Sequence, residues 1–195
     1  MNWFSNGGRA GTREQRRDVY QVNGLSGVGV KRRSGRSLEV KVRTAVGPKL
    51  TIAAGLAAPL EDWRKWTPSF TDSVWPQTGA SWVVVDKKLL TRTFTMADDE
   101  VVGPASHAGA NGGCDVELAA VTVDGIEAWT FAFEAFGPRR HRRAEVLSSW
   151  ERLVADSGAF DGLGVCFERA AGYPGWLRYV VSQPVGTPHR SRTAR

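Results

Sequence analysis

The chain has 195 residues, of which 42% are hydrophobic and 24% are charged, and its formal net charge at pH 7 is +6. This composition is typical of a folded protein and excludes a wholly disordered chain. It predicts one domain over residues 1–181, followed by a basic tail over residues 182–195 that we expect to be disordered. The excess of Lys and Arg favours anionic partners, such as phosphates, nucleic acid or an acidic surface.

Targeting signals and cysteine usage both point to the cytoplasm. The first residues, MNWFSNGGRAG, contain no apolar run long enough for a signal peptide, and no stretch approaches the length of a membrane span. Cys114 and Cys166 match no metal-binding spacing and suit reduced thiols, although a single disulfide between them stays open. We therefore expect a soluble, cytoplasmic protein with no membrane partner.

Short alternating patterns predict the first strands of the chain. We expect one strand over residues 2–5, a second over residues 17–23, and a hairpin over residues 28–44 with its turn at residues 34–36. One face of the hairpin is apolar. The other face carries Lys31, Arg33, Glu39, Lys41 and Arg43. This charged face either is solvated, as in an ordinary hairpin, or lines a concave anion-binding site, and the hairpin alone leaves both readings open.

The segment after the hairpin mixes strand and helix signals. We expect the second strand of the hairpin to end at residues 46–48, which include a proline. Residues 60–66 indicate a helical turn, because their two tryptophans are three positions apart. The alternating run over residues 81–95 predicts a long strand, and the pattern does not decide which of its central lysines faces inward. Residues 97–113 predict a polar, mobile loop.

A second hairpin and one long helix are predicted in the second half of the chain. Strands over residues 114–123 and 127–137 flank Asp124-Gly125, which is a strong hairpin turn signal. Residues 138–155 predict a helix with an apolar stripe. Residues 173–177 open a short final element.

The first turn of the predicted long helix is strongly basic. Its arginines are Arg139, Arg140, Arg142 and Arg143. Cations oppose the positive end of a helix dipole, so the run either binds an anion such as RNA or is a solvated run of charge. The sequence has no phosphate-loop, zinc-cluster or serine-hydrolase motif, and we expect no histidine-based catalytic site.

Charged residues recur on a single parity of several predicted strands. The cations in this pattern are Lys31, Arg33, Lys41, Arg43, Lys88 and Arg92. The acids are Glu39, Asp115, Glu117 and Glu134. A barrel lined in this way would hold a polyphosphate on its cations and Mg²⁺ or Mn²⁺ on its carboxylates, because hard cations need oxygen ligands. Such a site would support metal-assisted attack of water or a hydroxyl on phosphorus.

At these residues the sequence resembles the CYTH, or triphosphate tunnel metalloenzyme, superfamily, from about residue 19 to residue 177. The segments VGVKRR and LEVK of the first hairpin look like the family's basic strands. The run at residues 85–92 is similar to its later K-x-R strand. DVEL at residues 115–118 resembles its acidic strand, and FEAF and YPGWL resemble the segments before and after its long helix.

The resemblance implies an α+β fold, mainly antiparallel β, in which eight strands close into a tunnel with flanking helices. It also implies that the six cations bind the phosphates of a triphosphate or another organic phosphate, and that the four acids hold a divalent metal. The family carries E-x-E-x-K on its first strand, whereas here the predicted first strand has no acid and the first acid is Glu14.

Three functions follow from these observations and stay open. The first is a metal-dependent phosphohydrolase. The second is a non-catalytic module that binds a phosphorylated small molecule, a nucleotide or RNA, and the third is a structural β-scaffold whose charged faces are solvated.

Overall fold

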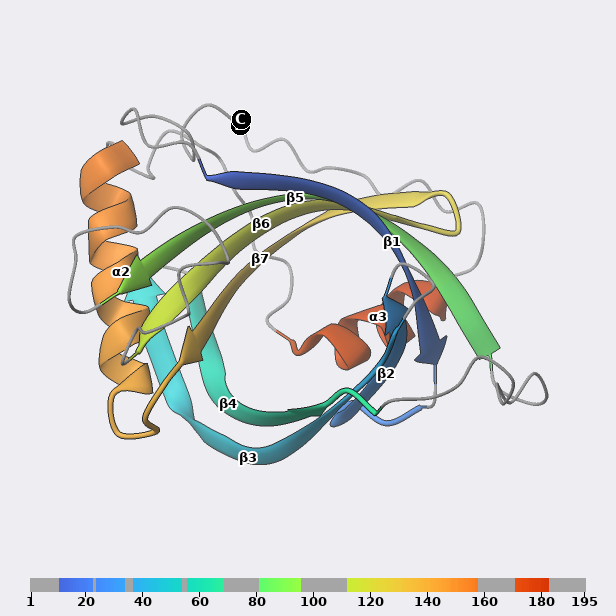
Figure 1. Ribbon diagram of the computed structural model, residues 1–195, viewed down its shortest axis with the longest axis horizontal. Coiled ribbons are helices and arrows are strands. Elements are labelled where there is room, and N and C mark those ends of the chain that lie inside the picture. The colour runs from blue at the N-terminus through green and yellow to red at the C-terminus, as the bar shows by residue number, and fades with distance from the viewer. Residues whose placement is uncertain are drawn as a thin grey trace. The chain divides into compact units, whose positions relative to one another are not determined.

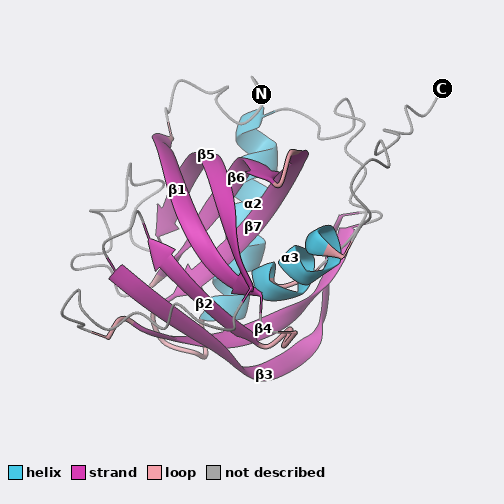
Figure 2. Ribbon diagram, turned by 90° about the vertical axis from the view of Figure 1, so that its right-hand side faces the viewer, coloured by secondary structure: helices cyan, strands magenta, loops and turns pink. Residues whose placement is uncertain are grey.

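The computed structural model describes residues 11–22, 24–33, 37–53, 56–68, 81–95, 112–157 and 171–182, and these residues form strands with two helices (Figures 1 and 2). The strands are β1 (Thr12–Val22), β2 (Val28–Arg33), β3 (Ser37–Ala53), β4 (Leu56–Trp66), β5 (Ser81–Thr95), β6 (Gly113–Val123) and β7 (Ile126–Phe136). The helices are α2 (Arg142–Ser157) and α3 (Tyr173–Val181). Neither helix in this described part is long and apolar enough to span a membrane.

The seven described strands form one sheet in the order β4-β3-β2-β1-β5-β6-β7. A mainly antiparallel sheet with two helices confirms the predicted fold class in outline. The predicted closed ring of eight strands is not what the described residues form. Closure requires every strand to have two neighbours, whereas β4 and β7 stand at the two ends of the strand order.

Contacts along the chain divide it into two compact units. The first unit contains β7 and α2 with the adjoining parts of β5 and β6. The second unit contains β2, β3, β4 and α3, most of β1, and β5 up to Lys87. One domain over residues 1–181 stays a prediction.

The first hairpin is confirmed in the second unit, and the strand before it is longer than predicted. β2 and β3 pair antiparallel with Lys31 opposite Glu39, and β1 pairs with β2 with Tyr20 opposite Lys31. β1 begins at Thr12, five residues before the predicted strand start. The predicted strand at residues 2–5 and the turn at residues 34–36 lie outside the described residues.

Two predictions for the segment after the hairpin are wrong. β3 does not end at residues 46–48 but continues to Ala53, because a register shift between Val46 and Lys49 accommodates Pro48. Residues 60–66 are not helical. They form the end of β4, where hydrogen bonding to the long neighbouring β3 outweighs a local pattern of two tryptophans three apart.

The strands over residues 81–95 and 114–123 are confirmed, and so is the turn between β6 and β7. Asp124 and Gly125 have φ angles of 48° and 79°. Two consecutive positive φ angles are what a type I′ hairpin turn requires, which is why Asp-Gly is favoured there. The predicted loop over residues 97–113, apart from its last two residues, lies outside the described residues.

In the first unit, α2 lies beside β7 (Figure 1), and its apolar stripe is buried. Trp150 is 7% exposed and meets the ring of Phe133 edge to face at 6.3 Å between centroids. Leu153 and Val146 are also buried. The predicted helix is confirmed, although it begins at Arg142 rather than at Pro138, so the first arginines of the basic run precede it.

Two ionisable side chains, those of Cys114 and Glu145, are buried in the first unit. Cys114 is a free thiol with no exposed surface, and burial raises its pKa to about 12, so it is a structural rather than a reactive cysteine. Glu145 of α2 is 2% exposed, and its Oε1 has no hydrogen-bond partner among the described residues. Burial raises the pKa of Glu145 above its ordinary value.

We expect Glu145→Gln to stabilise the protein at alkaline pH. The raised pKa means that the folded state binds the Glu145 proton more tightly than the unfolded state does, so this residue lowers stability as pH rises. The variant should melt about 2–4 °C higher at pH 8, for a gain on the order of 1 kcal/mol. The difference should vanish at about pH 3, which lies below the ordinary pKa of a glutamate, so that the side chain is protonated in both states. Glu151→Gln, at an exposed position of α2, is the matched control, and a lower melting temperature of Glu145→Gln at pH 8 would contradict the account.

Candidate functional site

The strand register of the second unit places its charged side chains on one face of the sheet. Directly opposed residues of antiparallel strands point to the same side. Tyr20 opposes Lys31, Lys31 opposes Glu39, and Lys41 opposes Lys65. We call the resulting surface the basic face. Its members are Arg16, Asp18, Tyr20, Lys31, Arg33, Glu39, Lys41, Arg43, Glu61, Trp63, Lys65 and Lys87.

The basic face is partly buried. Asp18, Tyr20, Glu39 and Lys87 are buried, Lys65 is exposed, and the other members are half-buried. Asp18 has no exposed surface, Lys87 is 4% exposed and Glu39 is 6% exposed. By contrast, the neighbours of Glu39 on the apolar parity of β3 are half-buried. The charged side of the hairpin is therefore partly removed from solvent, to about the same extent as its apolar side.

A network of ion pairs centres on Lys31. Its ammonium nitrogen lies 3.4 Å from Oδ2 of Asp18 and 3.3 Å from Oε2 of Glu39, so one cation bridges two buried carboxylates. Arg16 lies 3.2 Å from the same oxygen of Asp18, and Arg33 lies 3.4 Å from Oε1 of Glu39. The two carboxylates hold the flanking cations in place.

The electrostatics of Glu39 show which effect dominates in this network. Burial by itself raises the pKa of Glu39, but the charges of Lys31, Arg33 and Lys65 together outweigh burial and hold that pKa below its ordinary value. The carboxylate is therefore ionised at neutral pH. Its contribution to stability is present above the ordinary pKa of a glutamate and is lost as pH falls through the lowered one.

A second group of contacts lies on β3 and β4. The Arg43 guanidinium donates to Oε1 of Glu61 at 2.5 Å, and the indole nitrogen of Trp63 donates to Oε2 of Glu61 at 3.1 Å. The guanidinium also lies 5.9 Å from the centroid of the Trp63 ring. Arg43 is therefore fixed in position by an acid and an aromatic ring.

Lys87 of β5 is held between two tyrosines. Its ammonium donates to the hydroxyl of Tyr20 at 3.0 Å and lies 3.8 Å from the centroid of the Tyr173 ring. Tyr173 is the first residue of α3, and its ring packs against that of Tyr20 at 4.9 Å between centroids. This contact attaches α3 to the basic face.

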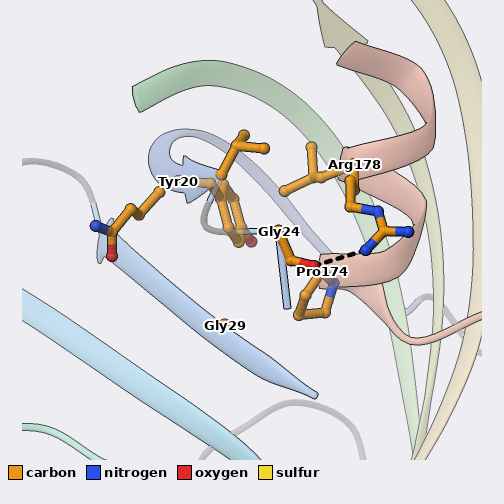
Figure 3. Close-up of a pocket in the computed structure, with 8 residues that line it drawn as sticks. Tyr20, Gly24, Gly29, Pro174 and Arg178 are labelled. Carbon is orange, nitrogen blue, oxygen red and sulfur yellow. Dashed lines mark hydrogen bonds between the residues drawn. The ribbon is translucent and has the colours of Figure 1, made fainter. Parts of the chain in front are cut away.

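Two further contacts fix α3 on the same unit (Figure 3). Arg178 donates to the backbone oxygen of Gly24 at 2.6 Å. Pro174 lies over Gly29, and a Cβ on Gly29 would be 3.1 Å from the proline ring, which is a tight contact. The pocket enclosed by these residues and Tyr20 has a volume of about 10 Å³, on the scale of one water molecule.

The sequence-predicted site residues are divided between the two units. Five of them share the basic face, namely Lys31, Arg33, Glu39, Lys41 and Arg43. The other five lie in the first unit. Of these, Lys88 and Glu134 are exposed, whereas Glu117 is half-buried. Asp115 accepts a hydrogen bond from the Thr93 hydroxyl at 2.6 Å, and Arg92 is 2% exposed beside the Phe94 ring.

Several residues of the basic face were not predicted from the sequence. Arg16 was missed because the predicted strand began at residue 17. Asp18 lies within that predicted strand, but its place on the basic face follows from the pairing of β1 with β2, which the sequence does not reveal. Lys87 was missed because it adjoins Lys88, and only burial distinguishes the two: Lys87 is buried on the basic face, whereas Lys88 is exposed. Tyr173 became part of the site through the packing of α3.

The described residues do not gather the donors that a divalent metal needs. Among them, no three His, Cys, Asp or Glu side chains lie close enough together to hold a metal ion. Of the four predicted metal ligands, Glu39 is in the second unit and already paired with Lys31 and Arg33, while the other three are in the first unit.

No model of a known protein family matches the chain, and no curated protein matches it.

Proposed function

We propose that the basic face binds a phosphorylated ligand, either a triphosphate or another organic phosphate, as the resemblance to the CYTH superfamily implies. The observation that carries the proposal is the composition of this face together with its burial. Seven cations and three acids of the second unit share it, so pairing within the face leaves an excess of positive charge. An anion would neutralise that excess.

Burial makes these charges effective for binding. Charged groups away from bulk water are screened less, so their attraction for an anion exceeds that of exposed lysines. Lysine and arginine also supply the hydrogen-bond donors that phosphate oxygens accept. The ion pairs with Asp18, Glu39 and Glu61 hold part of the cations in fixed positions, which lowers the entropy lost on binding.

A purely structural scaffold is the main alternative, and burial disfavours it. A scaffold gains nothing from removing charged side chains from water, because the cost of desolvating an ion pair often exceeds the attraction between its members. A solvated face would avoid that cost. A phosphate ligand explains these charges more readily, because the buried Asp18 and Glu39 hold Arg16, Lys31 and Arg33 in place for an anion.

We propose binding rather than metal-dependent hydrolysis. Hydrolysis as inferred from the sequence would need carboxylates free to hold Mg²⁺ or Mn²⁺. The carboxylates of the basic face are engaged by Lys31, Arg33, Arg16 and Arg43, so the described donor set does not fit a divalent cation there. Binding is accordingly expected without added metal.

A thermal-shift screen tests the proposal. Tripolyphosphate, ATP, GTP and thiamine phosphates are each added to the full chain with and without Mg²⁺ and Mn²⁺. A ligand present at 100 times its Kd stabilises the native state by about 2.7 kcal/mol, which for a chain of this size corresponds to about 5–10 °C. We expect at least one of these anions to give such a shift without metal, and Lys41→Ala to reduce it strongly.

Lys88→Ala is the matched control, because it removes the same charge from an exposed position. It should keep the full shift. If no anion shifts the melting temperature of the folded wild type, the proposed function is wrong and the scaffold reading stands. If the melting temperature rises only when Mg²⁺ or Mn²⁺ is present, the prediction of binding without a metal is wrong.

A further inference from the structure

The arginines at the start of α2 form a second positively charged surface, which belongs to the first unit and lies apart from the basic face in the sequence. Arg139, Arg140 and Arg143 are exposed. Arg142 is half-buried, and its Nε donates to the backbone oxygen of Gly137 at 3.0 Å. We call these four residues the arginine cluster. They fall within five consecutive positions, two just before α2 and two in its first turn.

The helix itself adds to this positive potential. The amino end of α2 carries the positive end of the helix dipole, where acidic residues are usually found. Its first turn contains a single acid, Glu145, which is 2% exposed and whose pKa is raised by burial. Glu145 therefore points into the unit rather than toward the exposed arginines. Such an arrangement lowers helix stability unless an anion joins it.

The chemistry of the cluster indicates which anion. All four cations are arginines, whose planar guanidinium groups bind phosphate oxygens in pairs. A membrane surface is disfavoured, because a helix that lies on lipid needs exposed apolar side chains. The apolar residues of α2 are buried in the unit instead, namely Val146, Trp150 and Leu153.

We infer that the arginine cluster binds the phosphate backbone of a nucleic acid, independently of the ligand of the basic face. Three exposed arginines set the expected salt dependence. For a single strand, log K falls with log salt with a slope of about −0.7 for each phosphate contacted, or about −2 for three. The affinity should therefore fall about 20-fold between 50 mM and 200 mM salt.

The test is fluorescence anisotropy of a labelled 20-nucleotide single-stranded RNA titrated with the full chain at several salt concentrations. The variant Arg139→Gln/Arg140→Gln/Arg143→Gln should bind at least tenfold more weakly at 50 mM salt and lose most of the salt dependence. The control variant Arg13→Gln/Lys49→Gln/Arg64→Gln removes the same three charges from exposed positions elsewhere. It should bind the RNA like the wild type.

Four results would overturn the inference. These are no RNA binding by the wild type, equal losses in both variants, a salt slope near zero, or binding to vesicles containing phosphatidylserine without binding to RNA. A thermal melt shows whether each variant is folded. If the triple variant does not fold, the single variant Arg140→Gln replaces it, and it should reduce the slope of log K against log salt by about 0.7. The melting-temperature shift caused by tripolyphosphate should be the same in these variants as in the wild type. A failure of RNA binding is therefore distinguishable from a failure of the proposed function.

Discussion

Lys31→Met should destabilise the protein by about 3–5 kcal/mol, the usual cost of removing one partner from a buried ion pair. Lys31 is the cation that bridges Asp18 and Glu39, and both carboxylates are almost completely buried. Methionine keeps most of the side-chain volume but removes the cation that the two buried carboxylates share, so that Asp18 keeps Arg16 and Glu39 keeps Arg33. Equilibrium unfolding in urea at pH 7 measures the change, and the melting temperature should fall by about 6–20 °C.

The double variant Lys31→Met/Glu39→Gln separates charge from packing. It removes one positive and one negative charge together, so it should recover much of the stability that Lys31→Met loses. The loss caused by Lys31→Met should also shrink at acidic pH, where Glu39 becomes protonated and no longer needs a cation. A loss below about 1 kcal/mol at pH 7 would mean that these charges are solvated in solution, and the buried basic face would be wrong.

Trp150→Ala should destabilise the protein by about 3–5 kcal/mol, the usual cost of truncating a large aromatic side chain in a core. Trp150 is 7% exposed and joins α2 to the sheet of the first unit through Phe133. The variant loses both the buried surface and the edge-to-face contact. The measurement is again urea unfolding at pH 7.

Trp129→Ala is the matched control in the same unit, because the same side chain there is 57% exposed. It should cost less than about 0.5 kcal/mol. Equal losses of stability in the two variants would show that Trp150 is no more buried than Trp129 in solution. The packing of the first unit described above would then be wrong.

The parts of the fold that the sequence predicts well are those with strong local signals. The alternation over residues 81–95 and the Asp124-Gly125 turn depend only on neighbouring residues, and both are confirmed. The end of β4 could not be predicted in this way. Its tryptophans are spaced as on a helix. The segment is a strand because Trp63 and Trp66 pair with Arg43 and Val40 of β3, which lie outside the window of a local pattern.

The candidate site was predictable on the first hairpin and only partly elsewhere. The parity of β3 groups Glu39 and Lys41 correctly, because alternation along one strand is a local property. Asp18 and Lys87 join the site through pairing between strands and through burial, neither of which a single strand reveals. The attachment of Tyr173 depends on how α3 packs, which is a tertiary effect.

Isothermal titration of tripolyphosphate into wild type, Lys41→Ala and Lys88→Ala, without metal, tests the central claim most directly. A hydrogen bond to a charged group contributes about 1.5–3 kcal/mol, so loss of Lys41 should weaken binding by about 10- to 100-fold. Lys88→Ala should bind within about twofold of wild type, because its lysine is exposed and outside the basic face. Equal weakening in both variants would indicate attraction to net charge alone, and it would contradict a phosphate site on the basic face.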